Sequence, residues 1–202
     1  MAVEMLVALL LSGTGTPSTA VVPDRSFSIR IVDDEDLVPL AGRGMMHAEV
    51  DRIWSQYGVE VLWNARVARE MPPVQMTVLL RGTRDRWPLG CVERVGDRLR
   101  RQIVVAGGAL SALLMGVGVN RDSPLWFGLY ARTFGRVVSH ELGHLLLDSA
   151  AHSPTGLMRT RFVTGDVKSA TDDRFALTAA EVERLRVMMM TSATWGMNDR
   201  HH

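Results

Sequence analysis

His140, Glu141 and His144 are the side chains whose types and spacing best suit metal binding and acid–base catalysis. They occupy the run His-Glu-Leu-Gly-His. On a helix, residues four apart lie one turn apart on the same face, so both imidazoles can ligate one ion. Glu141 is rotated from His140 by about 100°, one residue step of the helix, so it can act as a general base without occupying a coordination position. Since imidazole is a good zinc ligand, the pattern predicts a Zn²⁺ site.

The surroundings of this run favour a metal site over a solvated helix face. Residues 137–147 are otherwise mainly apolar. Burying two imidazoles and a carboxylate there without partners would cost several kcal/mol, and a metal removes that cost. Cys91 is the one cysteine of the chain, which excludes an internal disulfide and any multi-cysteine zinc or iron–sulfur site.

The third metal ligand must come from outside this run, because catalytic zinc usually has three protein ligands and a water. His152 lies eight residues after His144 and is the expected third ligand, which requires the chain to turn back after the helix. Asp148 stands near that turn. It is interpreted as a helix-ending residue, because Asp tolerates a left-handed conformation; the alternatives are a carboxylate ligand or a hydrogen-bond partner of a histidine ring.

The segment from Val137 to Arg159 resembles the metzincin clan of zinc metallopeptidases. It has His-Glu-x-x-His, a histidine shortly after, and a downstream Gly-Leu-Met that ends at Met158. The resemblance implies a zinc-dependent endopeptidase that hydrolyses peptide bonds through a metal-activated water. It also implies that Glu141 is the catalytic base, that His140, His144 and His152 bind zinc, and that Met158 lies in a tight turn beneath the metal.

The segment also departs from the clan's usual pattern at two positions. Leu147 and Ala150 stand where a glycine and the third ligand are usual, and His152 comes two residues later than expected. These departures concern the identity of the third ligand more than the presence of zinc. Ser153 and Arg159 lie near the motif without an assigned role at the oxyanion.

Two other functions are compatible with the same motif. In a gluzincin-like intracellular peptidase, Glu181 or Glu183 would supply a distant third ligand, although both fit capping and solvent-face positions of the last helix. In a zinc-stabilised binding module, the ion would hold the fold without turnover. Metal analysis and peptide cleavage separate these hypotheses.

Other residues with chemical potential are expected to be structural. His47 is predicted to lie on the surface of the first helix, and Cys91 is predicted to be a small buried residue. His201 and His202 end the chain and are not expected to contribute to a site.

The elements that must position the site follow from hydrophobic patterning. The pattern predicts strands at 26–32, 59–63, 74–80 and 102–106, and helices at about 46–57, 132–147 and 179–190. This order implies an α/β (α+β) domain, with a small mixed twisted sheet packed on the active-site helix and a C-terminal helix. The sheet edge between Trp87 and Ala106 is expected to hold an extended substrate.

Composition limits the classes of partner. The 202 residues suit a single metallopeptidase domain at 21–200, and 47% hydrophobic residues suffice for a core. With a net charge of +1 and scattered arginines, we expect a protein or peptide substrate and no nucleic acid. We also expect a monomer. No stable membrane insertion is expected, because the uncharged stretch from Ile103 to Val119 contains four glycines and suits a buried strand followed by a loop or short helix.

The first twenty residues suggest export. An apolar run from Met5 to Leu11 is followed by Ser18-Thr19-Ala20, which fits a signal peptide at 1–20 cleaved after Ala20. A secreted or periplasmic protein is therefore expected. The missing positive charge before the apolar run keeps a cytoplasmic location as the alternative.

Overall fold

A mixed five-stranded sheet forms one layer of the domain. The computed structural model describes residues 25–33, 40–63, 75–81, 88–96, 98–169 and 173–191, so the predicted signal segment and His201 and His202 lie outside the described residues. The strands are β1 (Arg25–Asp33), β2 (Val59–Trp63), β3 (Gln75–Arg81), β4 (Gly90–Val95) and β5 (Arg98–Ala106), in the order β2-β1-β3-β5-β4. β4 runs antiparallel to β5 and all other pairs are parallel, which confirms the predicted mixed sheet.

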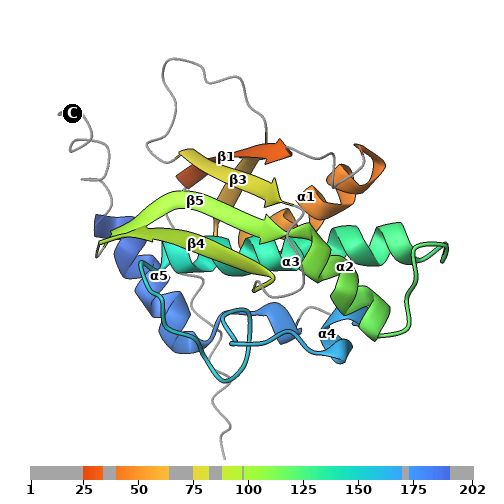
Figure 1. Cartoon of the computed structure of the whole chain (residues 1–202). Coiled ribbons are helices and arrows are strands. Elements are labelled where there is room, and N and C mark those ends of the chain that lie inside the picture. Colours follow the sequence, from red (N-terminus) through yellow and green to blue (C-terminus); the bar gives the residue numbers. More distant parts are fainter. Residues whose placement is uncertain are drawn as a thin grey trace, which may run out of the picture.

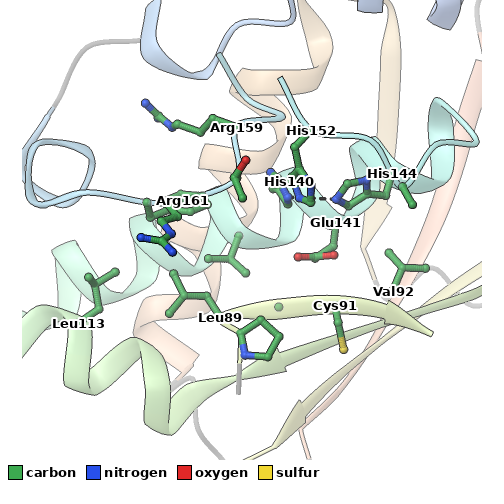
Figure 2. A pocket seen from close by; sticks show the side chains of 16 residues that line it. Leu89, Cys91, Val92, Leu113, His140, Glu141, His144, His152, Arg159 and Arg161 are labelled. Atoms are coloured by element: carbon green, nitrogen blue, oxygen red, sulfur yellow. Dashed lines mark hydrogen bonds between the residues drawn. The ribbon is translucent and has the colours of Figure 1, made fainter. Parts of the chain in front are cut away.

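Two long helices pack together beside this sheet (Figure 1). The helices are α1 (Leu40–Ser55), α2 (Gly107–Gly116), α3 (Trp126–Leu146), α4 (Thr164–Lys168) and α5 (Ala179–Thr191), with a 3₁₀ turn at Asp173–Phe175. α3 contacts both β4 and β5. Figure 2 shows β4 running alongside α3, with the loop that follows α3 on the opposite side of the helix. The end strand of the sheet and this loop therefore border the same stretch of α3.

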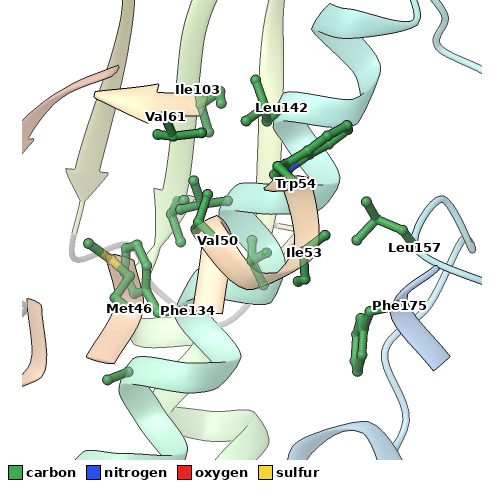
Figure 3. Close-up of a cluster of buried hydrophobic side chains, with 14 of the residues drawn as sticks. Met46, Val50, Ile53, Trp54, Val61, Ile103, Phe134, Leu142, Leu157 and Phe175 are labelled. Atoms are coloured by element: carbon green, nitrogen blue, oxygen red, sulfur yellow. The ribbon is translucent and has the colours of Figure 1, made fainter. Parts of the chain in front are cut away.

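The core lies between α1, α3 and the sheet (Figure 3). Met46, Val50, Ile53 and Trp54 are completely buried at the spacing of one helix face, as the sequence predicts for this segment. Phe134 of α3 packs into the same cluster. This packing gives α3 a rigid support on the side facing α1.

Three elements differ from the sequence-based prediction. α3 begins at Trp126 rather than Arg132, because Trp126, Tyr130 and Phe134 continue its buried stripe one turn after another. β4 was not predicted as a strand, although it lies within the region expected to form the sheet edge. The uncharged stretch is divided between β5 and the short helix α2. Among the described residues, no helix has the length and apolar character needed to cross a membrane.

A buried ion pair joins the two core helices. Arg136 of α3 is fully buried, and its Nε donates a hydrogen bond to Oε1 of Glu49 on α1 at 2.6 Å. Its guanidinium also donates to the backbone carbonyls of Asp166 and, at 2.8 Å, Ser169, and it lies over the Phe175 ring at 4.4 Å. One arginine therefore connects α1, α3 and the chain beyond the histidine-rich loop, one helical turn before His140.

Candidate metal centre

Three histidines converge on one point beside α3. His140 and His144 lie on the same face of the helix and are buried, whereas His152 comes from the loop after α3 and is exposed. One ring nitrogen from each histidine lies within 4.8 Å of the other two. Figure 2 shows the three rings together above Glu141. The structure thus brings together the residues whose types and spacing first indicated a metal site.

A tight turn after α3 returns His152 to the helix. Asp148 has a left-handed backbone with φ of +44°, and the amide of Ser149 donates to the carbonyl of His144 at 3.0 Å. From α5, Arg184 donates to the carbonyls of Leu147 at 2.6 Å and Asp148 at 2.9 Å. Asp148 is therefore placed as a helix-ending residue, and among the described residues it does not belong to the group of possible metal ligands.

Backbone carbonyls orient the two helical imidazoles. Nδ1 of His140 lies 2.8 Å from the Leu157 carbonyl oxygen, and Nδ1 of His144 lies 2.7 Å from that of Ser149. Because a carbonyl oxygen can only accept a hydrogen bond, each Nδ1 must carry the proton. In a neutral ring, Nε2 then presents a lone pair. A metal-binding histidine usually donates a hydrogen bond from its other ring nitrogen in this way.

The two Nε2 atoms face each other at 3.1 Å. Neither can donate to the other while both rings are neutral, so two lone pairs point at the same small space. Burial lowers the pKa of His140 to about 4 and also lowers the pKa of His144, so both rings are neutral near pH 7. A cation between them would satisfy both lone pairs.

The spacing of these nitrogens suits zinc. With Zn–N bonds of about 2.0–2.1 Å and tetrahedral angles, two ligand nitrogens lie about 3.3 Å apart. The His152 ring is centred 5.3 Å from that of His140 and 4.9 Å from that of His144, so it completes a set of three nitrogen donors. Three protein ligands leave a coordination position free, as in catalytic zinc sites. The donor set therefore fits a zinc ion.

Glu141 lies on the opposite side of this site, against β4. A Cβ atom at Gly90 would be only 2.8 Å from Oε1 of Glu141 and 2.8 Å from Cγ1 of Val137, so the strand passes too close for any larger residue. Burial raises the pKa of Glu141 to about 8. The charge of a metal ion at the histidines would lower this pKa again. Such a carboxyl group can accept and release a proton near neutral pH.

Met158 supports the helix between the two histidines. Its side chain is buried, and a Cβ atom at Gly143 would collide with its Sδ atom. The preceding residue, Leu157, supplies the carbonyl that holds His140. Residues 157 and 158 therefore fix both the helix backbone and the His140 ring. Gly143 makes room for Met158 because it has no side chain, a role that the sequence did not indicate.

The alternative glutamate ligands are engaged elsewhere. The Glu181 carboxylate accepts hydrogen bonds from the Thr178 amide at 2.7 Å and from the Ser153 hydroxyl, which confirms the predicted capping box. Glu183 lies on the exposed side of α5, 3.5 Å from Arg186. Among the described residues, neither glutamate belongs to the group of possible metal ligands. Glu181 instead tethers the residue that follows His152.

A cavity of about 610 Å³ opens beside the histidines and Glu141. Its other walls come from the start of β4, from α2 and from the loop at 159–162 (Figure 2). β4 is the end strand of the sheet and pairs only with β5 among the described strands, so its other edge remains available for main-chain hydrogen bonds. This edge lies in the region predicted to hold substrate.

The burial of Cys91 and of His47 differs from the prediction. Cys91 is half-buried and lines the cavity, so it is less buried than predicted. His47 is also half-buried rather than on the surface, because its ring stacks on Trp63 with centroids 3.7 Å apart. Burial, together with the nearby charge of Arg43, lowers the pKa of His47 to about 4.

Comparisons with known proteins yield only a distant likeness. No protein-family model and no curated protein matches the sequence. Twenty chains of solved structures match, among them the crystal structure of archaemetzincin from Methanopyrus kandleri, which is 16% identical, with a TM-score of 0.49. That match covers 82% of this chain and 96% of the other. The likeness is too low to assign a family or an activity.

Proposed function

We propose that this protein is a zinc-dependent endopeptidase of metzincin type. The observation that carries the proposal is the pair of Nε2 atoms of His140 and His144, which face each other at 3.1 Å with both Nδ1 atoms held by backbone carbonyls. His152 would supply the third nitrogen. Met158 beneath the helix and the turn at Asp148 are consistent with this type of site.

Residues of the chain itself transfer the proton and bind the substrate. A zinc ion bound here would supply a Lewis acid that polarises the scissile carbonyl and favours deprotonation of water. Glu141 accepts the proton of the attacking water on its carboxylate and passes it to the nitrogen of the leaving amine. The free edge of β4 holds the substrate backbone extended. Water is added across the C–N bond, with no other reactant.

Replacing Glu141 tests the catalytic part of this proposal. We expect Glu141→Gln to reduce peptide cleavage by about 10²–10⁴-fold, because the amide cannot accept the proton. Zinc content should stay unchanged, since Glu141 is not a ligand in the proposal. The measurement is cleavage of a peptide library by the zinc-loaded full chain, together with metal analysis of both proteins. A wild-type protein that binds zinc and cleaves nothing would instead be a zinc-stabilised binding module.

A further inference from the structure

Two arginines line the cavity, and one of them is held by a buried carboxylate. Arg159 lies 3.1 Å from the buried carboxylate of Asp166, and its guanidinium lies over the Phe175 ring at 4.9 Å. Figure 2 shows this side chain turned away from the cavity. The same carboxylate also pairs with Arg174 at 3.6 Å. Arg159 therefore holds the loop in place, and its guanidinium is directed at Asp166 rather than into the cavity.

Arg161 is placed differently. It is exposed, it lines the cavity, and Figure 2 shows its guanidinium turned toward the side formed by Leu89 and Leu113. Within the part of the chain that the structure describes, no carboxylate forms an ion pair with it. Two residues apart on the same loop, one arginine is thus held against a carboxylate, and the other has no carboxylate partner among the described residues.

The charge balance of the cavity favours an anionic ligand. Apart from the three histidines, the ionisable side chains of the wall are one acidic residue, Glu141, and two basic ones, Arg159 and Arg161. A zinc ion would make the cavity strongly positive. Leu89, Leu113 and Phe162 are apolar, so they reduce competition from water for the guanidinium. A carboxylate matches a guanidinium in charge and can accept two parallel hydrogen bonds from it.

We propose that Arg161 binds a carboxylate of the peptide substrate and so directs the enzyme to acidic peptides. This inference rests on the proposed endopeptidase function. The cavity of 610 Å³ is about 10 Å across, the span of about three extended residues, so the carboxylate belongs to a residue close to the scissile bond. In an endopeptidase substrate it comes from an Asp or Glu side chain, and the C-terminal carboxylate of a short probe offers the same chemistry for comparison.

Short peptidyl hydroxamates test the proposal by binding alone. The hydroxamate anchors each probe at the metal, and the probes differ only in a neighbouring side chain, which is Glu, Gln or Lys. Each is made with a free C-terminal carboxylate and with a C-terminal amide. Dissociation constants are measured by calorimetry with the zinc-loaded full chain. We expect the Glu probe, the free-carboxylate probe or both to bind roughly fivefold more tightly than their neutral counterparts, the upper range for an exposed ion pair.

Variants assign the preference to one side chain. Arg161→Glu should abolish the preference for the acidic probe and favour the Lys probe, whereas Arg161→Lys should keep part of it because the charge remains without the planar fork. Arg121→Glu is the matched control, since Arg121 is an exposed arginine that does not line the cavity. It should leave all the ratios unchanged.

The possible results separate this inference from the proposed function. Equal binding of charged and neutral probes by the wild type, or an unchanged ratio in Arg161→Glu, overturns the role of Arg161 and leaves the peptidase intact. A ratio that depends on Arg161 in a protein that cleaves no peptide supports the carboxylate site and counts against the peptidase. Failure of every hydroxamate to bind overturns both.

Discussion

Each imidazole on α3 has one nitrogen committed to a backbone carbonyl and one left for a ligand. The carbonyls of Leu157 and Ser149 accept hydrogen bonds from the Nδ1 atoms and so leave Nε2 of each ring for a ligand. Both come from the chain after the helix, so the loop that presents His152 also orients His140 and His144. The loop and the ligands are therefore a single unit, and disturbing the loop should disturb metal binding.

His152 and Asp148 can be distinguished as ligands by substitution. We expect His152→Ala to weaken zinc affinity by more than the 10–100-fold that follows loss of an outer partner. Asp148→Asn should bind zinc like the wild type, because Asn also tolerates the left-handed backbone. Affinity is measured by competition with a chromophoric chelator. Equal affinity of His152→Ala and the wild type would remove His152 from the ligand set.

His47 should make stability depend on pH far from the metal site. Its folded-state pKa of about 4 lies below the ordinary value of 6.5 because of burial, so the unfolded chain binds more protons between these values. Stability is therefore lost as the pH falls from about 6.5 to about 4. His47→Phe keeps a ring against Trp63 and removes this loss.

The measurement for His47 is the urea midpoint of both proteins at pH 7 and pH 5, with excess chelator so that zinc release does not contribute. The wild-type midpoint should fall more than that of the variant. Parallel changes in the two proteins would show that His47 does not titrate as its burial implies.

At the scale of elements, the site lies between one strand, one helix and one loop. β4 approaches α3 at Gly90, and the loop from 148 to 162 covers the other side of the histidines. The buried Arg136–Glu49 pair and the core residues of α1 hold α3 from behind. The helix thus has support on the side away from the cavity, where catalysis does not require access.

Gly90→Ala tests the close approach of β4. An added Cβ would meet Glu141 and Val137 at 2.8 Å, so the strand or the Glu141 side chain must move. We expect about a tenfold or larger loss of peptide cleavage with zinc content retained, because catalytic groups displaced by about 1 Å lose up to 10²-fold in rate. Gly116→Ala is the control, since a Cβ there has nothing within 4 Å. Equal activity of the two variants would contradict the proposed placement of Glu141.

At the scale of the whole molecule, zinc should contribute to stability, because its ligands come from both α3 and the loop after it. A ligand at 100 times its Kd adds about 2.7 kcal/mol if it binds only the folded state. For a domain of this size that corresponds to roughly 5–10 °C in Tm. We expect removal of zinc by a chelator to lower the Tm by this amount.

The Tm is measured by scanning calorimetry with and without chelator, and two variants serve as controls. Glu141→Gln keeps all three histidines and should show the full decrease in Tm on chelation. His144→Ala lacks one buried ligand and should show little change. A wild-type Tm that chelation leaves unaltered would mean that no metal is held by the folded protein.

The sequence alone determined the local part of this site. The spacing of His140, Glu141 and His144 places two rings on one face of a helix and the carboxyl on another, because helix geometry depends only on neighbouring backbone hydrogen bonds. The core face of α1 and the capping box at Thr178 were predictable for the same reason, since both depend on residues within a few positions of each other.

Only the tertiary structure decided what surrounds these residues. Reach and ligand type favoured His152 over Asp148 as the third ligand, but the turn that returns His152 to the helix is held by Arg184, which is distant in sequence. β4 escaped prediction because its six residues, Gly-Cys-Val-Glu-Arg-Val, show no regular alternation. The close approach of Gly90 to Glu141 and the placement of Arg161 at the cavity arise from packing between distant segments. Long-range packing of this kind has no periodic signature in the sequence.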